Sequence, residues 1–326
     1  MRIVVYGLGA IGSAIAGFLA RSGQDVTGIA RGATLERLRR EPLGIERPSG
    51  PVTVRLPVVD GPGAIDWADD DLVVLAVKSQ HTAGVLAELA RFAPATLPVV
   101  CAQNGVHNEQ EALRYFRNVY GIAVLCPTAL VRPGVVQSYA EPVPGILDVG
   151  RWPAGADDHA ARCTTALAAA GFSSRPEPEV SRWKWRKLLA NLDNAVDAIC
   201  GPDARRSPLS DRAIAEGRAC LAAAGIQTAT AEEERARRGD LLHVQPVGGA
   251  GRPGASTWQS LARRTGSIET PYLNGEMVLL GAVHGVPTPV NAMLVQVMAR
   301  LAHSGAGPGS ISLEQLTAMA GPAVAA

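Results

Sequence analysis

The sequence predicts an α/β protein with a parallel-sheet domain at its N-terminus and an all-helical domain at its C-terminus. In the first half of the chain, short and almost continuously apolar segments alternate with helical segments, as in α/β domains. Beyond Arg175–Pro178, apolar residues recur three and four positions apart, which is typical of helices. We therefore expect two domains, residues 1–176 and 177–326.

Composition narrows the class of protein. With 326 residues, each domain can bury its own core, and the net charge of +1 gives no reason to expect nucleic acid or an anionic membrane as a partner. No apolar run reaches the ~18 residues of a membrane span, and no apolar leader precedes the first strand. The five cysteines form no C-x-x-C pair, which favours reduced thiols over a disulfide framework or a zinc site. We expect a cytoplasmic protein without a bound metal.

The first domain is expected to contain strands at residues 3–6, 24–30, 71–77 and 97–102. A helix at 82–92 connects the last two, as a right-handed β-α-β crossover requires. Further strand-like segments, 118–130 and 135–149, are separated by the turn signal Arg132-Pro133-Gly134 and are expected to extend the sheet.

The second domain is expected to be helical almost throughout. Pro246–Gly254 is rich in glycine and proline and predicts a loop, and the end of the tail 304–326 is expected to be poorly ordered. The expected helices are 159–171, which ends the first domain, and 179–199, 208–226, 228–242, 254–265, 271–285 and 288–303.

The most informative motif is the glycine turn after the first strand, Gly7-Leu8-Gly9-Ala10-Ile11-Gly12. A G-x-G-x-x-G motif between a strand and a helix is the fingerprint of Rossmann-type dinucleotide binding. Gly7 permits the tight turn, Gly9 lets the backbone approach a pyrophosphate, and Gly12 allows close packing of helix and strand. The helix N-terminus supplies N–H groups and positive potential for the phosphates.

Arg31 follows the second strand, where dinucleotide folds meet the adenosine ribose. An acid at this place hydrogen-bonds the 2′-OH of NADH, whereas an arginine accommodates the 2′-phosphate of NADPH. The sequence Ile29-Ala30-Arg31-Gly32 contains no acid, so NADPH is favoured. The alternative is an ordinary surface arginine that begins the next segment.

Two more segments follow strands at the edge where open α/β sheets bind ligands. Lys78 comes after the third strand and could face a phosphate or a ribose, or it is a solvated loop lysine. Asn104, in Gln103-Asn104-Gly105, follows the fourth strand beside the expected nicotinamide site. An Asn-Gly pair also marks ordinary turns, so a purely structural role is the alternative.

The candidate catalytic and substrate-binding residues of the second domain lie in two segments. On one helix, Lys187, Asn191 and Asn194 would occupy positions i, i+4 and i+7 and so share a face, although a solvent-facing polar stripe would look the same. Thr270-Pro271 looks like an N-cap with proline in the first turn, which would place Glu269 at a helix start. Glu269 could bind a substrate hydroxyl, pair with Lys187, or simply complement the helix dipole.

These motifs, taken in order along residues 1 to about 300, resemble the ketopantoate reductase (2-dehydropantoate 2-reductase) family. The resemblance rests on the glycine turn, Arg31, Val77-Lys78, Gln103-Asn104-Gly105, Trp185-Arg186-Lys187-Leu188-x-x-Asn191, Glu269-x-x-Tyr272-Leu273-Asn274-Gly275 and His284-Gly285-Val286-Pro287-Thr288-Pro289-Val290-Asn291.

The resemblance implies an oxidoreductase of pantothenate biosynthesis that reduces 2-dehydropantoate to (R)-pantoate with NADPH, at a site built by both domains. It implies that Lys187 is the general acid that protonates the carbonyl oxygen, and that Glu269 acts with it. Asn104 would contact the nicotinamide ribose and the substrate. The substrate-binding set implied by the resemblance is Asn104, Lys187, Asn191, Asn194, Ser256 and Glu269.

The chain departs from the family pattern at the substrate. The family often has a second asparagine eight residues after the lysine, where this chain has Ala195, and a further asparagine is replaced within Pro202–Arg206. A paralogous NADP-dependent reductase of another carbonyl or imine therefore stays open, as does a non-catalytic NADP(H)-binding sensor. The apolar surface of the helical domain is compatible with a homodimer.

Overall fold

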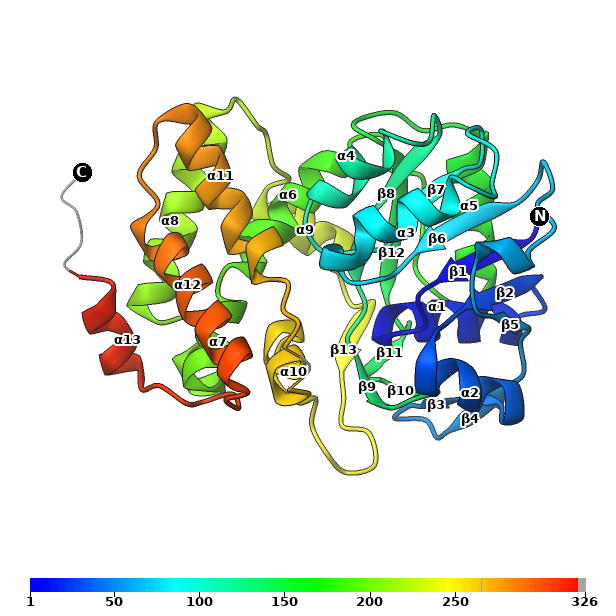
Figure 1. The fold of residues 1–326 in the computed structure, drawn as a ribbon, viewed down its shortest axis with the longest axis horizontal. Helices are drawn as coiled ribbons and strands as arrows, with labels where there is room; N and C mark the ends of the chain where they lie inside the picture. Colours follow the sequence, from blue (N-terminus) through cyan, green and yellow to red (C-terminus); the bar gives the residue numbers. More distant parts are fainter. Residues whose placement is uncertain (265, 322–326) are drawn as a thin grey trace. The chain divides into compact units, whose positions relative to one another are not determined.

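The computed structural model describes residues 1–264 and 266–321. The chain divides into two compact units, drawn in Figure 1. The first comprises Met1–Lys184 and Thr230–Arg252, and the second comprises Trp185–Ala229 and Pro253–Ala326. The division thus falls after Lys184, later than the predicted 176/177, and a segment that the sequence places in the helical domain belongs to the first unit.

The first unit is built on a seven-stranded sheet with the order β12-β8-β7-β6-β1-β2-β5. All neighbouring strands are parallel except β12, which runs antiparallel to β8. The mixed α/β class with a parallel sheet is therefore confirmed. The strands are β1 (Ile3–Tyr6), β2 (Val26–Ile29), β5 (Val58–Val59), β6 (Leu72–Leu75), β7 (Val99–Cys101), β8 (Val119–Leu125) and β12 (Ile146–Arg151).

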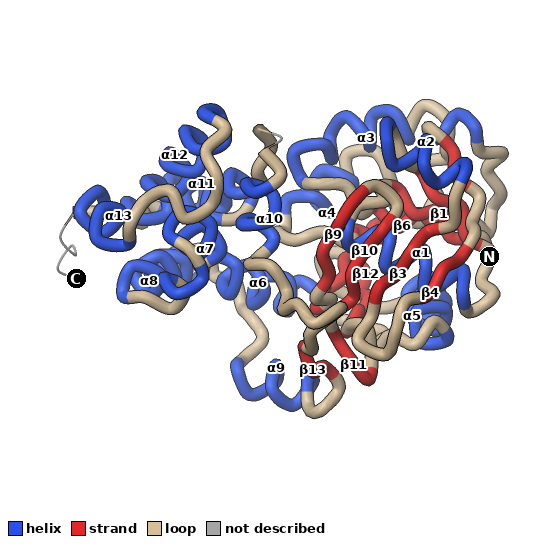
Figure 2. The backbone as a smooth tube through the Cα atoms, turned by 90° about the horizontal axis from the view of Figure 1, so that it is seen from below, coloured by secondary structure: helices blue, strands red, loops and turns tan. Residues whose placement is uncertain are grey.

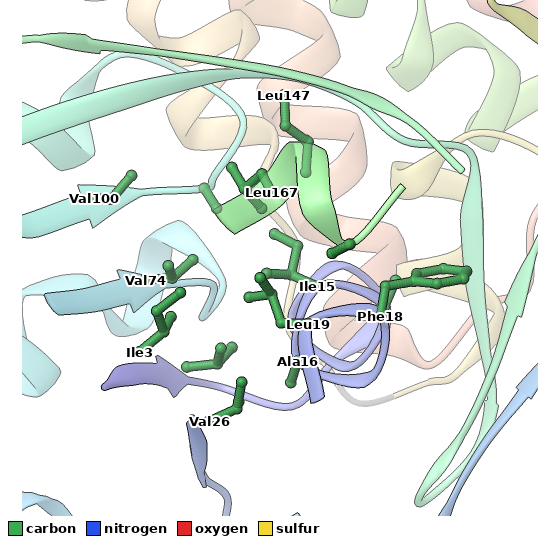
Figure 3. Close-up of a cluster of buried hydrophobic side chains, with 14 of the residues drawn as sticks. Ile3, Ile15, Ala16, Phe18, Leu19, Val26, Val74, Val100, Leu147 and Leu167 are labelled. Carbon is green, nitrogen blue, oxygen red and sulfur yellow. The ribbon is translucent and has the colours of Figure 1, made fainter. Parts of the chain in front are cut away.

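Helices cover this sheet and close its core. Figure 3 shows Ile3 and Val74 of neighbouring strands in one apolar cluster with Ile15 and Leu19 of α1. These strand residues are completely or almost completely buried, as expected for a parallel sheet that helices cover. The helices of this region are α1 (Ala10–Arg21), α2 (Gly32–Arg40), α3 (Thr82–Leu89), α4 (His107–Ala112) and α5 (Asp158–Ala169), with short 3₁₀ turns at η1 (Pro62–Ala64) and η2 (Ser79–His81).

A second sheet corrects one prediction. Residues 118–130 and 135–149 extend the main sheet only through β8 and β12, because the turn at Arg132–Gly134 folds the intervening chain into a separate sheet of order β4-β3-β10-β9. Val135 and Val136 of β10 are buried there. Its strands are β3 (Leu43–Glu46), β4 (Val52–Val54), β9 (Thr128–Arg132) and β10 (Val135–Ser138).

The segment Thr230–Arg252 packs with the first unit through polar contacts and strand pairing. Strand β13 (Leu242–Val244) pairs with β11 (Ala140–Pro142), in place of the end of the predicted helix 228–242. Arg237, on α9 (Ala231–Arg238), donates to Asp148 at 2.6 and 2.7 Å. No residue of α9 is buried, so its apolar spacing carries no information about the unit to which it belongs.

The second unit consists of helices joined by loops, drawn as blue and tan tube in Figure 2. Its core gathers side chains such as Val196, Leu209, Leu294 and Met298. Its helices are the end of α6 (Val180–Asn191), α7 (Asn194–Cys200), α8 (Pro208–Ala223), α10 (Ser256–Ala262), α11 (Asn274–His284), α12 (Pro289–Ser304) and α13 (Leu313–Met319), with 3₁₀ turns at η3 (Pro202–Ala204) and η4 (Thr270–Tyr272).

The single helix expected over 179–199 is two helices. α6 ends at Asn191 and α7 begins at Asn194, and the carbonyl of Leu192, which lies at this break, accepts a hydrogen bond from Nδ2 of Asn274 at 3.0 Å. Asn274 also donates to Oδ1 of Asn291 at 3.0 Å, and both amides are buried. These asparagines belong to the family-like motifs, and here they stabilise the break between α6 and α7.

Over the described residues, no helix has both the length and the apolar character that a membrane span requires. Nor do His, Cys, Asp and Glu side chains cluster into a group that could hold a metal within that part of the chain. The predicted disorder at the end of the tail concerns residues 322–326, which lie outside the described residues.

Candidate active site

The glycine turn after β1 has the close packing that its sequence predicts. Gly7 has a φ of +101°, and a Cβ added there would lie 2.7 Å from Cγ1 of Val77. A Cβ on Gly12 would overlap the carbonyl oxygen of Gly7. Since both sites exclude any larger residue, the turn can bring the start of α1 against β1 and the loop after β6 only with glycine at these positions.

Gly9 differs, because a Cβ built on it would meet no atom within 4 Å. It is the N-cap of α1, and within the described chain the first turn of α1 has neither a side-chain cap nor an acidic residue. Open space before uncapped helical N–H groups fits the pyrophosphate of a dinucleotide.

Four candidate residues lie at one edge of the sheet. Strands β7, β6, β1 and β2 are neighbours and run parallel, so the segments that follow them emerge on the same side. These segments begin with or contain Asn104, Lys78, Gly7 and Arg31. The structure therefore brings the predicted cofactor-binding residues of the first unit to one edge.

Arg31 has partners that the sequence did not indicate. It is the N-cap of α2, and its guanidinium forms an ion pair with Glu88 of α3. Its Nη2 also donates to the hydroxyl of Tyr6, the last residue of β1, at 3.1 Å. An acid therefore lies beside Arg31, although no acid stands directly after β2 in the sequence.

The loop that contains Asn104 is held by buried hydrogen bonds. Nε2 of Gln103 donates to the carbonyl of Val77 at 2.9 Å and to Oγ1 of Thr82 at 2.8 Å. Nδ2 of Asn108 donates to the carbonyl of Asn104 at 3.0 Å. The loops after β6 and β7 are thus connected, and the backbone of Asn104 is fixed.

Behind this loop lies a buried ion pair. Lys184 of α6 pairs with Glu109 of α4, and their side chains are only 2% and 0% exposed. Nζ of Lys184 also donates to the carbonyl of Gln103 at 2.9 Å. Burial raises the pKa of Glu109, and the attraction of Lys184 opposes that shift. The sequence does not predict this pair. The one local sign that Lys184 is buried is its position between Trp183 and Trp185, and nothing near Lys184 points to Glu109.

In the second unit, α6 carries two of the predicted residues. Lys187 is half-buried and Asn191 is buried. They are four residues apart on one helix and therefore share a face. Asn194 does not belong to this stripe, because it begins α7 after the helix break.

Asn194 lies instead beside Arg205, whose Nη2 donates to its Oδ1 at 3.3 Å. Arg205 also forms a bidentate pair with Asp193 at 2.9 and 3.2 Å. The neighbouring Ala195 is 1% exposed and packs in the apolar core. The position where the family often has asparagine is therefore part of the hydrophobic core in this chain.

Ser256 and Glu269 lie at the starts of short helical elements. Ser256 begins α10, and the preceding residue Ala255 donates its N–H to the buried carboxylate of Asp197 on α7 at 2.8 Å. Glu269 is buried and is itself the N-cap of η4, so the cap falls one residue before the predicted Thr270. Partial burial lowers the pKa of Arg263, and the attraction of Glu269 opposes that shift.

The sheet order, the glycine turn and the open helix N-terminus define a dinucleotide-binding protein of the Rossmann class that has a second, helical unit. Comparison with known proteins narrows this class. The model of the family "Ketopantoate reductase PanE/ApbA" matches residues 3–154, and its C-terminal counterpart matches residues 179–302.

Individual relatives support the same family. A 2-dehydropantoate 2-reductase of Halobacterium salinarum is 29% identical over 316 residues, which cover 91% of this chain and 98% of that protein. The crystal structure of a PanE/ApbA family ketopantoate reductase from Ralstonia eutropha JMP134 superposes with a TM-score of 0.78 at 26% identity, covering 94% and 99% of the two chains. D-mandelate dehydrogenase, solved with NADH and anilino(oxo)acetate, has the same TM-score and coverages at 20% identity, which shows the shared fold.

This chain belongs to the ketopantoate reductase family, and it is an oxidoreductase of that family's type.

Proposed function

We propose that this chain uses NADPH to reduce the ketone of a 2-oxo acid, with 2-dehydropantoate, giving (R)-pantoate, as the first substrate to test. One observation carries the proposal. In this member of the family, the segments that contain Gly7–Gly12, Arg31, Lys78 and Asn104 emerge at a single sheet edge. The binding of a nicotinamide dinucleotide requires such an arrangement.

In this proposal the second unit supplies the proton. NADPH, when bound, provides the hydride for the carbonyl carbon. The ammonium of Lys187 donates a proton to the carbonyl oxygen, so the ketone gains one hydride and one proton and becomes a hydroxyl group. An ammonium directed at the developing negative charge both stabilises that charge and donates the proton.

The remaining roles follow from residue chemistry. Asn191, one helical turn from Lys187, would hydrogen-bond the substrate. Ser256 and the buried Glu269 would bind its polar groups, with Glu269 also acting on Lys187. Asn194 would present its Nδ2 to a substrate oxygen, because Arg205 occupies its Oδ1. Asn104 would contact the nicotinamide ribose and the substrate.

A second candidate is the reduction of a different 2-oxo acid. The observation that favours it is Ala195, which offers a buried methyl group in the apolar core where the family often has an amide. A site with one amide fewer binds a substrate hydroxyl less well.

The test is NADPH oxidation with 2-dehydropantoate and a panel of other 2-oxo acids. Lys187→Ala should lower kcat by roughly 10²- to 10⁴-fold, the usual contribution of a general acid, while leaving NADPH binding intact. Arg186→Ala, which removes a positive charge from the next position on α6, is the matched control and should retain turnover. Tight NADPH binding without turnover of any 2-oxo acid would contradict the proposal and favour a sensor.

We further propose that the protein is cytoplasmic and forms a homodimer. Light scattering of the purified chain measures the oligomeric state, and a monomer at working concentration would remove the dimer from the proposal.

A further inference from the structure

An acid and an arginine meet at the place where the ribose of the cofactor is expected. The guanidinium of Arg31, at the end of β2, pairs with the carboxylate of Glu88. Both side chains are accessible to solvent, with Arg31 60% exposed and Glu88 31% exposed. A ligand can therefore reach this pair.

Tyr6 holds Glu88 in place. The hydroxyl of Tyr6 donates to Oε2 of Glu88 at 2.5 Å, and it accepts a hydrogen bond from Nη2 of Arg31 at 3.1 Å. Tyr6 is 2% exposed, so its hydroxyl is a fixed point of this cluster. Burial, followed by the hydrogen bond to Glu88, raises the pKa of Tyr6, which keeps it a donor at neutral pH.

The cluster combines two kinds of ribose recognition that usually exclude each other. Proteins that prefer NADH place an acid on the ribose 2′-OH, and proteins that prefer NADPH place an arginine on the 2′-phosphate. Here the arginine follows β2, and α3 supplies an acid 57 residues further along the chain. The sequence around β2 therefore indicates NADPH, while the structure adds the group that recognises NADH.

We propose that Glu88 is a specificity-determining residue that weakens the binding of a 2′-phosphate at Arg31 and accepts a hydrogen bond from an unphosphorylated 2′-hydroxyl. The chain then uses NADH as well as NADPH. This inference rests on the proposed function, since it concerns the cofactor of the same reaction.

Electrostatics gives the expected size of the effect. A 2′-phosphate bound at Arg31 would lie next to the carboxylate of Glu88 and compete with it for the guanidinium. Two like charges about 4 Å apart weaken binding by roughly fivefold even in water, and a phosphate near neutral pH carries more than one charge. Removal of the carboxylate should therefore strengthen 2′-phosphate binding by about tenfold, and less at high salt.

The experiment measures binding of adenosine 2′,5′-bisphosphate and of 5′-AMP to the full chain by calorimetry, with kcat/KM for NADPH and NADH alongside. Glu88→Gln keeps the shape of the side chain and should raise the bisphosphate-to-AMP affinity ratio by about tenfold. The kcat/KM ratio of NADPH to NADH should rise in parallel. Glu41→Gln is the matched control. It removes the same charge from a carboxylate that pairs with Arg37 on α2, the helix whose N-cap is Arg31.

A bisphosphate-to-AMP ratio that stays within twofold of the wild type in Glu88→Gln would overturn the inference, as would an equal rise in Glu41→Gln. If the chain reduces a 2-oxo acid but the bisphosphate-to-AMP affinity ratio is unchanged in Glu88→Gln, the role of Glu88 is refuted and the proposed reductase activity is not. Absence of turnover with either cofactor would refute the reductase, while the nucleotide titrations would still decide whether Glu88 controls recognition of the 2′ position.

Discussion

Replacement of Lys184 by methionine tests whether the buried ion pair supports the first unit. Lys184 and Glu109 are 2% and 0% exposed, so neither charge has water to replace its partner. Breaking a buried pair by removing one member typically costs about 3–5 kcal/mol, because the other charge stays buried without compensation. The carbonyl of Gln103 also loses its hydrogen bond from Nζ. We expect Lys184→Met to lower the free energy of unfolding by about 3–5 kcal/mol near neutral pH.

The loss of stability in Lys184→Met should increase as the pH rises. Burial raises the pKa of Glu109 above its ordinary value of 4.5, and Lys184 opposes this. Without Lys184, folded Glu109 retains a proton that the unfolded chain releases, so stability falls as the pH rises from near 4.5 toward the folded pKa. Below that window Glu109 is protonated in both states, and the substitution costs least.

Urea unfolding followed by tryptophan fluorescence, at about pH 5 and about pH 8, measures this dependence. The double variant Lys184→Met/Glu109→Gln is the control: it buries no charge at the pair, and it should recover at least about 2 kcal/mol at the higher pH. A loss of equal size at both pH values, or one below about 1 kcal/mol, would refute the assignment of a buried, mutually compensating pair.

Two further pairs of substitutions test other parts of the structure. Gly9→Ala should fold normally, since its Cβ faces open space, but should weaken dinucleotide binding by at least about tenfold, whereas Gly12→Ala should lower stability by about 1–3 kcal/mol as well. Equal stability of the two variants in thermal unfolding would contradict the packing of the turn. Asn274→Ala should cost about 1–3 kcal/mol, because the buried carbonyl of Leu192 loses its donor, and the less buried Asn118→Ala should cost less. Urea unfolding decides this, and equal losses would refute the role of Asn274 at the helix break.

The sequence predicted which segments gather at one edge of the sheet, because the determinants of that arrangement are local. A strand, a glycine turn and a helix specify one another within a dozen residues. The carboxyl ends of parallel strands meet at the same edge of a sheet, so Arg31, Lys78 and Asn104 could be placed there from the order of strands and helices alone.

Contacts between distant elements were not predictable. The partners of Arg31 come from β1 and α3, and a single sequence gives no signal that joins Glu88 to the end of β2. The helix break after Asn191 has the same origin, since the group that satisfies the Leu192 carbonyl comes from Asn274 on another helix. Apolar periodicity identifies a buried face but not the surface against which it packs.

We propose that NADPH transfers its hydride to the carbonyl carbon of a 2-oxo acid bound by this chain. The decisive experiment incubates the chain with 2-dehydropantoate and NADPH deuterated at the hydride-donating carbon and analyses the product by NMR. We expect pantoate with deuterium on the carbon that bears the new hydroxyl group, and almost no such product with Lys187→Ala. Unreacted 2-dehydropantoate, in a preparation that binds NADPH, would contradict the assignment of this substrate.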